Sequence, residues 1–248
     1  MNVVIIAARM GSSRFPGKSL ADINGKTMLS FLLDRIIKSK VIDKVVLATT
    51  NLKEDDVLEK WSVENDVMCY RGSSNDVLGR IYNAAVWVKA TKIIEILGDN
   101  PLVDSELIDS CYSKTLENKN KIDYAATITT EYPLENSNLK KFPIGVRVQV
   151  MTIDALELLN KLAKSSFNRE HSTSLIYENP KLLRTNFLCA DNHFLNCNRP
   201  DLTFAVNHQK NIELIRSIDK ALKSKRNYKL KDVIEFIDNN PHLKELMG

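Results

Sequence analysis

The chain has 248 residues, of which 44% are hydrophobic and 27% are charged, enough to bury a full core. Its 35 Lys and Arg against 31 Asp and Glu give a net charge of only +4, with no basic block interleaved with aromatic residues, so a nucleic-acid partner is not expected. No apolar run reaches the length of about eighteen residues that a membrane span needs, and the N-terminal run is too short for a signal peptide. A cytoplasmic protein without a membrane partner is therefore expected.

Strands and helices alternate in the hydrophobic pattern of the first hundred residues. The pattern predicts a strand at 2–8, a helix at 28–39, a strand at 44–49, a helix at 54–65, a strand at 67–70, a helix at 76–89 and a strand at 93–97. This order predicts an α/β fold with a mostly parallel sheet flanked by helices, in which ligands bind at the carboxyl ends of the strands.

The pattern changes from about residue 123 onward. Strands are expected at 124–130 and 145–151 on either side of a polar loop at 131–141, followed by helices at 154–164, 211–223 and 231–239. No internal repeat or disordered linker interrupts the chain. Residues 1–248 are therefore expected to form one domain.

The four cysteines are scattered, with no CxxC pair among Cys69, Cys111, Cys189 and Cys197. Reduced thiols are the simplest interpretation. A zinc cluster of Cys189, His193 and Cys197 is a weaker alternative, because three ligands do not close a zinc site.

The first strand runs into a basic loop that contains two glycines. Arg9, Arg14 and Lys18 supply three cations, while Gly11 and Gly17 allow the backbone to turn or to approach a ligand closely. Successive backbone N–H groups and cations of this kind suit the oxygens of a polyphosphate. A solvated surface loop that happens to be basic is the alternative.

Two well-known phosphate loops do not fit this segment. The Walker pattern has four residues between its glycines, whereas five separate Gly11 from Gly17. The dinucleotide fingerprint needs three spaced glycines, and this loop has two.

A second polar segment, Gly98-Asp99-Asn100-Pro101, follows the strand expected at 93–97. A carboxylate at a strand end beside a triphosphate can hold Mg²⁺, although the same four residue types also form plain turns. Because the basic loop and Asp99 both follow strands of one parallel sheet, they are expected to converge at its carboxyl edge.

Six further segments follow the basic loop in a familiar order. They are Ile-Asp-Lys-Val-Val-Leu-Ala-Thr at 42–49, Arg-Gly-Ser-Ser-Asn-Asp-Val-Leu at 71–78, Gly-Asp-Asn-Pro-Leu at 98–102, Phe-Pro-Ile-Gly at 142–145, Arg-Glu-His at 169–171 and a terminal strand near Val206. Together they resemble the cytidylyltransferases that make CMP-activated acidic sugars, in particular the SpsF-like branch and its CMP-Kdo and CMP-acylneuraminate synthetase relatives. The resemblance covers about residues 3–216.

This resemblance implies a Rossmann-like fold of the nucleotide-diphospho-sugar transferase type. It implies transfer of CMP from CTP to an acidic sugar of the ulosonic or nonulosonic acid type, with release of pyrophosphate and with Mg²⁺ as cofactor, for surface-glycan biosynthesis. It also implies a homodimer, and a small insertion at about residues 123–175 that helps to form the sugar pocket and the dimer interface.

The resemblance also implies roles for individual residues. Catalysis falls to Arg9, Lys18 and Asp99, and the metal ion to Asp99 and Asn207. The nucleotide-binding residues are Ala7, Ala8, Arg9, Met10, Gly11, Ser12, Arg14, Lys18, Arg71, Asn75, Asp76, Arg80 and Gly98, with Arg80 placed one helical turn after Asp76, where the two could pair. The acceptor-binding residues are Gly145, Arg147, Arg169 and His171.

The downstream half departs from the family pattern. Relatives commonly read Phe-Pro-x-Gly-x-Asp-x-Glu, but Arg147 and Gln149 occupy the two acidic positions, and Asn207 stands where an Asp is usual. Arg147 either binds a carboxylate or phosphate of the acceptor or is a surface arginine on a strand. His171 either faces the acceptor or is a buried structural histidine.

These departures leave two other functions open. One is CTP-dependent transfer to another carboxylated or phosphorylated acceptor, and the other is a nucleotide-binding homologue without catalysis. A glycosyltransferase is disfavoured because the sequence has no Asp-x-Asp metal motif.

Overall fold

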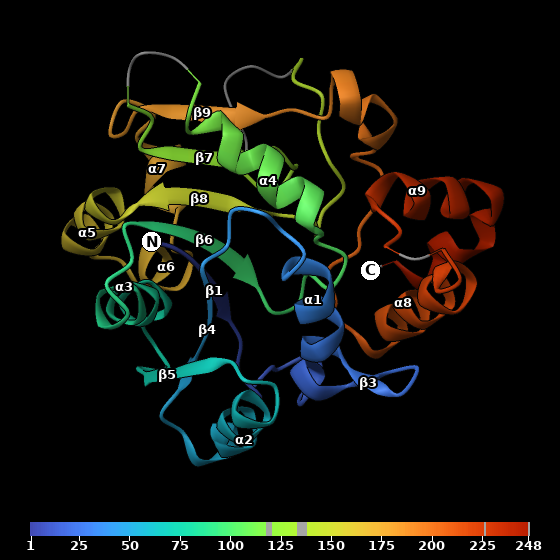
Figure 1. The fold of residues 1–248 in the computed structure, drawn as a ribbon, viewed down its shortest axis with the longest axis horizontal. Coiled ribbons are helices and arrows are strands. Elements are labelled where there is room, and N and C mark those ends of the chain that lie inside the picture. The colour runs from blue at the N-terminus through green and yellow to red at the C-terminus, as the bar shows by residue number, and fades with distance from the viewer. Residues whose placement is uncertain (118–120, 133–137, 226, 248) are drawn as a thin grey trace.

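The structure, a computed structural model, describes residues 1–117, 121–132, 138–225 and 227–247 (Figure 1). Within them the central sheet has seven strands in the order β5-β4-β1-β6-β8-β7-β9. The strands are β1 (Asn2–Ala7), β4 (Lys44–Thr50), β5 (Met68–Gly72), β6 (Lys92–Leu97), β7 (Tyr124–Thr127), β8 (Gln149–Thr152) and β9 (Thr185–Leu188). Among these strands only β8 runs antiparallel to its neighbours. The predicted α/β fold with a mostly parallel sheet is confirmed.

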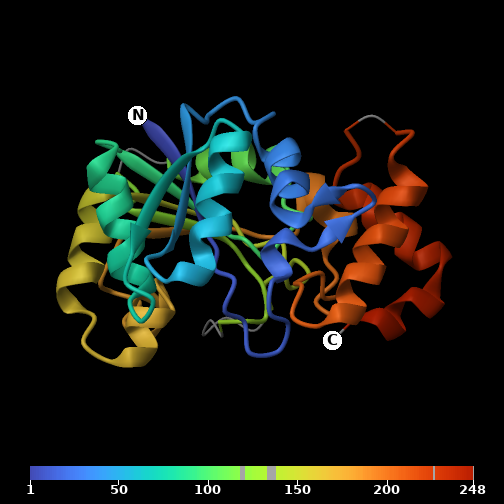
Figure 2. The ribbon, with the colours of Figure 1, turned by 90° about the horizontal axis from the view of Figure 1, so that it is seen from below.

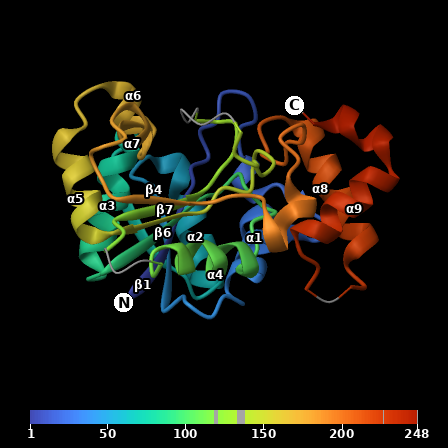
Figure 3. The same ribbon diagram turned by 90° about the horizontal axis from the view of Figure 1, so that it is seen from above.

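Helices cover both faces of this sheet, as the apolar runs of its strands require. In β1, Val4 and Ile6 point into one core and Val3 and Ile5 into the other. The first core is covered by α1 (Met28–Ile36), α2 (Asp56–Glu64), α4 (Ser105–Lys114), α8 (Gln209–Leu222) and α9 (Leu230–Asn239), and the second by α3 (Val77–Trp87), α5 (Ile153–Leu162) and α7 (Ser174–Glu178). Figures 2 and 3 show α8 and α9 together at the end of the molecule opposite α3 and α5.

Capping side chains fix where several helices begin. The Asp76 carboxylate accepts the N–H of Gly79 at the start of α3, at 2.8 Å. Asp104 accepts two N–H groups of the first turn of α4, and Thr152 caps α5. Such caps satisfy backbone donors that a helix start leaves without an intrahelical partner. The cap of α3 also fixes the Asp76 carboxylate, which forms an ion pair with Arg169.

The predicted helices at 28–39, 54–65, 76–89, 154–164, 211–223 and 231–239 and the first four predicted strands are present, with ends shifted by a few residues. The first helix ends at Ile36, and the Ser39 N–H donates to the Ile36 carbonyl three residues earlier instead of continuing the i to i−4 pattern. The sequence prediction missed α4, β9 and the hairpin of β2 (Asp22–Ile23) and β3 (Lys26–Thr27).

The strand predicted at 145–151 is present as β8, but it begins four residues later, at Gln149. Gly145 precedes it with φ +87°, and a Cβ there would lie 2.1 Å from the backbone nitrogen of Ala205. Residues near 145 therefore cross the segment at 202–205 at close range, joined by a single bridge between Ile144 and Thr203.

The terminal strand expected near Val206 is wrong. The Val206 N–H donates to the carbonyl of Asp99 at 2.9 Å, and its carbonyl accepts from the Lys18 ammonium at 2.8 Å. The Val206 N–H thus bonds to a turn residue instead of a neighbouring strand, and the residue lies outside the sheet. The polar loop predicted at 131–141 includes residues 133–137, which lie outside the described part of the chain.

All four cysteines are free, as expected for reduced thiols. Burial raises the pKa of the Cys197 thiol to about 12. His193 contacts Glu106 at 2.5 Å, and nowhere among the described residues do three or more His, Cys, Asp or Glu side chains gather in a way that could hold a metal ion. Of the helices in the described ranges, none is long and apolar enough to cross a membrane.

Candidate active site

A cavity of about 380 Å³ opens at the carboxyl ends of β1 and β6. Of the residues singled out in the sequence, its lining includes Ala7, Ala8, Arg9, Ser12, Arg14, Lys18, Arg80, Gly98, Asp99, Arg147, His171 and Asn207. Parallel strands place the loops that follow them at one edge of the sheet. This explains why Lys18 and Asp99, 81 positions apart in the chain, meet here, as the alternation of strands and helices predicted. Arg147 and Asn207 reach the cavity from segments that do not follow a parallel strand.

Hydrogen bonds from side chains and from the backbone hold the backbone of the basic loop in place. Asp55, which is fully buried, accepts the N–H of Met10 at 2.6 Å, and Ser19 donates its hydroxyl to the carbonyl of Arg9 at 3.1 Å. Gly17 adopts φ +77°, a conformation that favours glycine, and its N–H donates to the carbonyl of Met10. The loop therefore has a defined shape before any ligand arrives.

Lys18 and Asp99 meet at the centre of the carboxyl edge. The Lys18 ammonium lies 2.7 Å from Oδ2 of Asp99 and also donates to the carbonyl of Val206. Their side chains are 14% and 25% exposed, so the pair is partly shielded from solvent. The predicted convergence of the basic loop with Asp99 is thus present as a direct ion pair.

The two loop arginines have weaker and more exposed partners. Arg14 donates to Oδ1 of Asn207 at 3.0 Å, while Arg9 lies 3.4 Å from Glu170 and donates to the carbonyl of Ser74. Ion pairs in solvent contribute little stability. An anionic ligand with several oxygens could therefore replace these partners at small cost.

Arg80 lines the same cavity from α3 and is only 3% exposed. Burial, reinforced by the nearby charge of Arg9, lowers the pKa of Arg80 to about 10, so it stays protonated at neutral pH. It donates to the carbonyl of Ser73 at 2.7 Å, and its Nε has no hydrogen-bond partner among the described residues. The expected pair with Asp76 is not formed, because the cap of α3 and an ion pair with Arg169 occupy the Asp76 carboxylate.

Arg147 lies on the far side of the cavity and is 5% exposed, so the alternative of a surface arginine is wrong. Its guanidinium lies 4.0 Å from the centre of the Tyr132 ring. Its Nη2 donates to Gln149 Oε1 at 2.8 Å and to Thr173 Oγ1 at 3.1 Å. Stacking and two neutral hydrogen bonds hold this cation in place without a carboxylate.

Glu95 was missed by sequence reasoning and faces the same cavity from β6. Its side chain is 1% exposed and pairs in register with Gln149 of β8. Ser172 donates to Oε1 at 2.6 Å, whereas Oε2 has no partner in the described parts of the chain. Burial raises the pKa of this carboxyl group. A lone Glu in the apolar run Ile93–Leu97 is the sequence signal that could have revealed it.

Several predicted site residues lie outside the cavity lining: Met10, Gly11, Arg71, Asn75, Asp76, Gly145 and Arg169. Arg71 points away and binds Asp56 and Glu59 as well as two backbone carbonyls. Arg169 ties the segment before α7 to Asp76 at the start of α3. His171 does reach the lining and is exposed, so it is not a buried structural histidine.

Comparisons with known proteins agree with this arrangement. The sequence model of the cytidylyltransferase family matches residues 3–241. The chain is 35% identical to an uncharacterized protein of Methanocaldococcus jannaschii, over 98% of this chain and 92% of the relative. It is 28% identical to the spore coat polysaccharide biosynthesis protein SpsF of Bacillus subtilis, over 96% and 94%. It is also 35% identical to a 3-deoxy-manno-octulosonate cytidylyltransferase of Neisseria meningitidis, over 50% of this chain and 49% of the relative.

A solved structure gives the same result. The structure of a cytidylyltransferase from Leptospira borgpetersenii serovar Hardjo-bovis superposes with a TM-score of 0.86 at 28% identity, covering 98% of this chain and 96% of that one. The resemblance seen in the sequence motifs is therefore confirmed across nearly the whole chain. The protein belongs to the cytidylyltransferase family and is a CTP-dependent nucleotidyltransferase.

Proposed function

We propose that the protein transfers CMP from CTP to a hydroxyl group of an acidic sugar, of the ulosonic or nonulosonic acid type, for the synthesis of a surface glycan. The observation that carries this proposal is a single cavity that contains both the basic loop with Asp99 and the buried cation Arg147. Glu95, Leu97, Gly98 and Asp99 all line this cavity, so it runs along the end of β6 and the following turn. A triphosphate beside the loop and a sugar acid beside Arg147 would occupy its two ends.

The reaction is a displacement at phosphorus. The acceptor oxygen forms a bond to the α-phosphorus, the bond from that phosphorus to the bridging oxygen of the β-phosphate breaks, and pyrophosphate leaves while the hydroxyl proton goes to solvent. The protein's contribution is positioning and neutralisation of negative charge. Lys18, Arg9 and Arg14 reach the cavity from one loop and are the groups suited to that task.

The residues at the carboxyl edge suit Mg²⁺. Lys18 occupies one carboxylate oxygen of Asp99, and Oδ1 has no hydrogen-bond partner within the described ranges, while Asn207 offers an amide oxygen in the same cavity. Mg²⁺ is commonly held by one or two carboxylates together with substrate phosphates and water. Asp99 and Asn207 would hold the ion, which would neutralise phosphate charge and orient the triphosphate.

Arg147 supports an acidic acceptor. A buried guanidinium in a ligand cavity is suited to a planar carboxylate. Separately from Arg147, the similarity to a 3-deoxy-manno-octulosonate cytidylyltransferase supports a sugar acid as acceptor. A phosphorylated acceptor would use the same cation and is the second candidate. The homodimer and the insertion at about 123–175 that contributes to it stay predictions.

Pyrophosphate release tests the proposal. Purified protein with Mg²⁺ is given each of the four nucleoside triphosphates and a panel of ulosonic, nonulosonic and phosphorylated sugars. Release is expected with CTP and an acidic sugar. Equal use of all four nucleotides would overturn the cytidylyl assignment, and release only with phosphorylated sugars would favour the second candidate. CTP binding without product across the panel would indicate a nucleotide-binding homologue without catalysis.

A further inference from the structure

Glu95 is a buried titratable side chain in the cavity that the transfer reaction does not use. It is 1% exposed on β6, and Ser172 satisfies only one of its two carboxylate oxygens. The other oxygen, Oε2, has no partner among the described residues, although the side chain lines the cavity. A buried carboxylate oxygen without a donor is costly, and a hydrogen-bond donor on a ligand would remove that cost.

Arg147 places a fixed positive charge on the same side of the cavity. Glu95 pairs in register with Gln149, Gln149 accepts a hydrogen bond from Arg147, and all three side chains line the cavity. Gln149 Oε1 accepts hydrogen bonds from Arg147, from Thr173 and from Tyr124. This network fixes the guanidinium before any acceptor binds.

The two charges do not neutralise each other by direct contact. No ion pair within 4.0 Å joins Glu95 to Arg147 in the described parts of the chain, and each is held instead by neutral groups, the Ser172 hydroxyl for Glu95 and Gln149 with Thr173 for Arg147. Separate buried charges of opposite sign are best matched by a ligand that carries both signs.

We propose that the acceptor is a zwitterionic amino sugar acid, whose acidic group binds Arg147 and whose amino group binds Glu95. This inference rests on the proposed function and narrows its acceptor class. A hydroxyl in place of the amine would give Oε2 a hydrogen bond but no countercharge, so the amino form is preferred. Glu95 is then a specificity-determining residue, and Ser172 orients its carboxylate.

The test compares two acceptors that differ only in an amino group and a hydroxyl at one carbon of the same sugar acid. The panel covers the possible positions of that group, and kcat/KM for CMP transfer is measured with CTP saturating. The wild type is expected to prefer the amino form. Glu95→Gln keeps the shape of the side chain and the bond from Ser172, and it is expected to lower kcat/KM for the amino acceptor by roughly 10- to 100-fold, mainly through KM, as for loss of a charged hydrogen bond. The hydroxyl acceptor has no countercharge to lose, so its kcat/KM should fall distinctly less than that of the amino acceptor.

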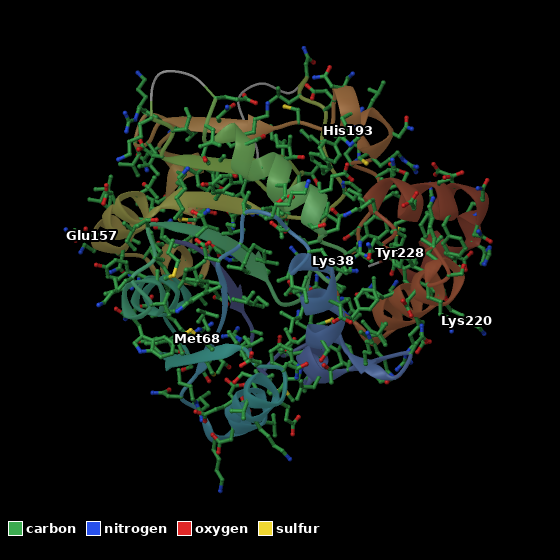
Figure 4. The ribbon with its side chains drawn as sticks, viewed as in Figure 1. Lys38, Met68, Glu157, His193, Lys220 and Tyr228 are labelled. Carbon is green, nitrogen blue, oxygen red and sulfur yellow. The ribbon has the colours of Figure 1, made fainter. Side chains whose placement is uncertain are left out.

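Glu157→Gln is the matched control, since Glu157 lies on the outer side of α5, paired with Lys161 and away from the cavity (Figure 4). It should alter neither acceptor, and circular dichroism with a thermal melt checks the fold of both variants. Equal losses for both acceptors in Glu95→Gln, or no amino preference in the wild type, would overturn the inference and leave the proposed function standing. Failure of the wild type to transfer CMP to any sugar acid would overturn the proposed function and the inference with it.

Discussion

The two ends of the cavity hold their charges in different ways. At the loop end, the side chains of Arg9 and its partner Glu170 are 41% and 57% exposed, and they are 3.4 Å apart. At the other end, which is the proposed acceptor end, Glu95 and Arg147 are at most 5% exposed and are held by neutral hydrogen bonds. Solvent weakens the first kind of interaction, whereas burial away from solvent makes changes to the second kind more costly.

This difference assigns two tasks to the two ends: the loop end attracts negative charge, and the other end selects among acceptors. Exposed cations on a shaped loop can exchange their protein partners for phosphate oxygens, whatever the rest of the ligand looks like. Buried charges are fixed before binding, and a ligand that does not match them leaves them without a partner. We therefore expect substitutions at the loop end to lower the rate for every acceptor, and substitutions at the acceptor end to change which acceptor is used.

The largest expected effect is loss of a loop cation. Arg9→Ala or Lys18→Ala should lower turnover by about a hundredfold or more, the range found when one preorganised group that stabilises developing charge is removed. The same loss should appear with every acceptor, measured as pyrophosphate release under saturating CTP. Lys220→Ala, on the outer surface of α8 (Figure 4), is the control and should keep the wild-type rate. Near-normal turnover in both loop variants would mean that this segment is a solvated surface loop without a role in catalysis.

The next effect concerns the metal ion. Asp99→Asn should raise the Mg²⁺ concentration for half-maximal turnover by roughly tenfold, and Asn207→Asp should lower it, because carboxylates bind Mg²⁺ more strongly than amides. Excess chelator should abolish turnover, and added Mg²⁺ should restore it. The two substitutions should couple in a double-mutant cycle, since ligands of one ion are not independent. A titration that Asn207→Asp leaves unchanged, beside a large shift in Asp99→Asn, would place Asn207 outside the metal site.

The pH dependence of stability tests the burial of Glu95. Burial raises the pKa of Glu95, so the folded protein holds that proton more tightly than the unfolded chain, whose glutamates titrate at about 4.3. As the pH rises from about 4.3 through the folded-state pKa, the wild type must lose this proton at a cost that Glu95→Gln avoids. The free energy of unfolding of the wild type, relative to the variant, should therefore fall with rising pH. Urea denaturation of both proteins between pH 4.5 and 7.5 measures this difference. If the free energies of unfolding of the two proteins changed in parallel with pH, the burial of the Glu95 carboxyl group would be contradicted.

The smallest effect is expected at the exposed ion pair. Glu170→Gln removes the carboxylate partner of Arg9, and the free energy of unfolding should change by less than about 1 kcal/mol because solvent already screens the pair. Chemical denaturation at low and high salt gives the measurement. A loss of several kcal/mol would mean that the two ends of the cavity do not differ as described.

Much of the loop end was readable from the sequence. The apolar run of β1, the cations and glycines after it and the Gly98-Asp99 turn after β6 are local features, and alternation of strands with helices was enough to bring them together. The structure of the segment around Val206 could not be predicted in the same way. Val206 looks like a strand residue, but its backbone bonds to Asp99 and Lys18, which are distant in the chain.

The sequence by itself determined the parallel sheet, the position of the basic loop and the family, because periodicity and short motifs are carried by neighbouring residues. Only the tertiary structure decided that Arg147 is buried against Tyr132, that Asp76 pairs with Arg169, and that Glu95 faces the acceptor end. Those contacts depend on the register of β6 against β8 and on where the segment between α6 (Ser166–Glu170) and α7 folds over them. Register shifts exchange the faces of a whole strand, so no local pattern of residues specifies which side chains meet across it.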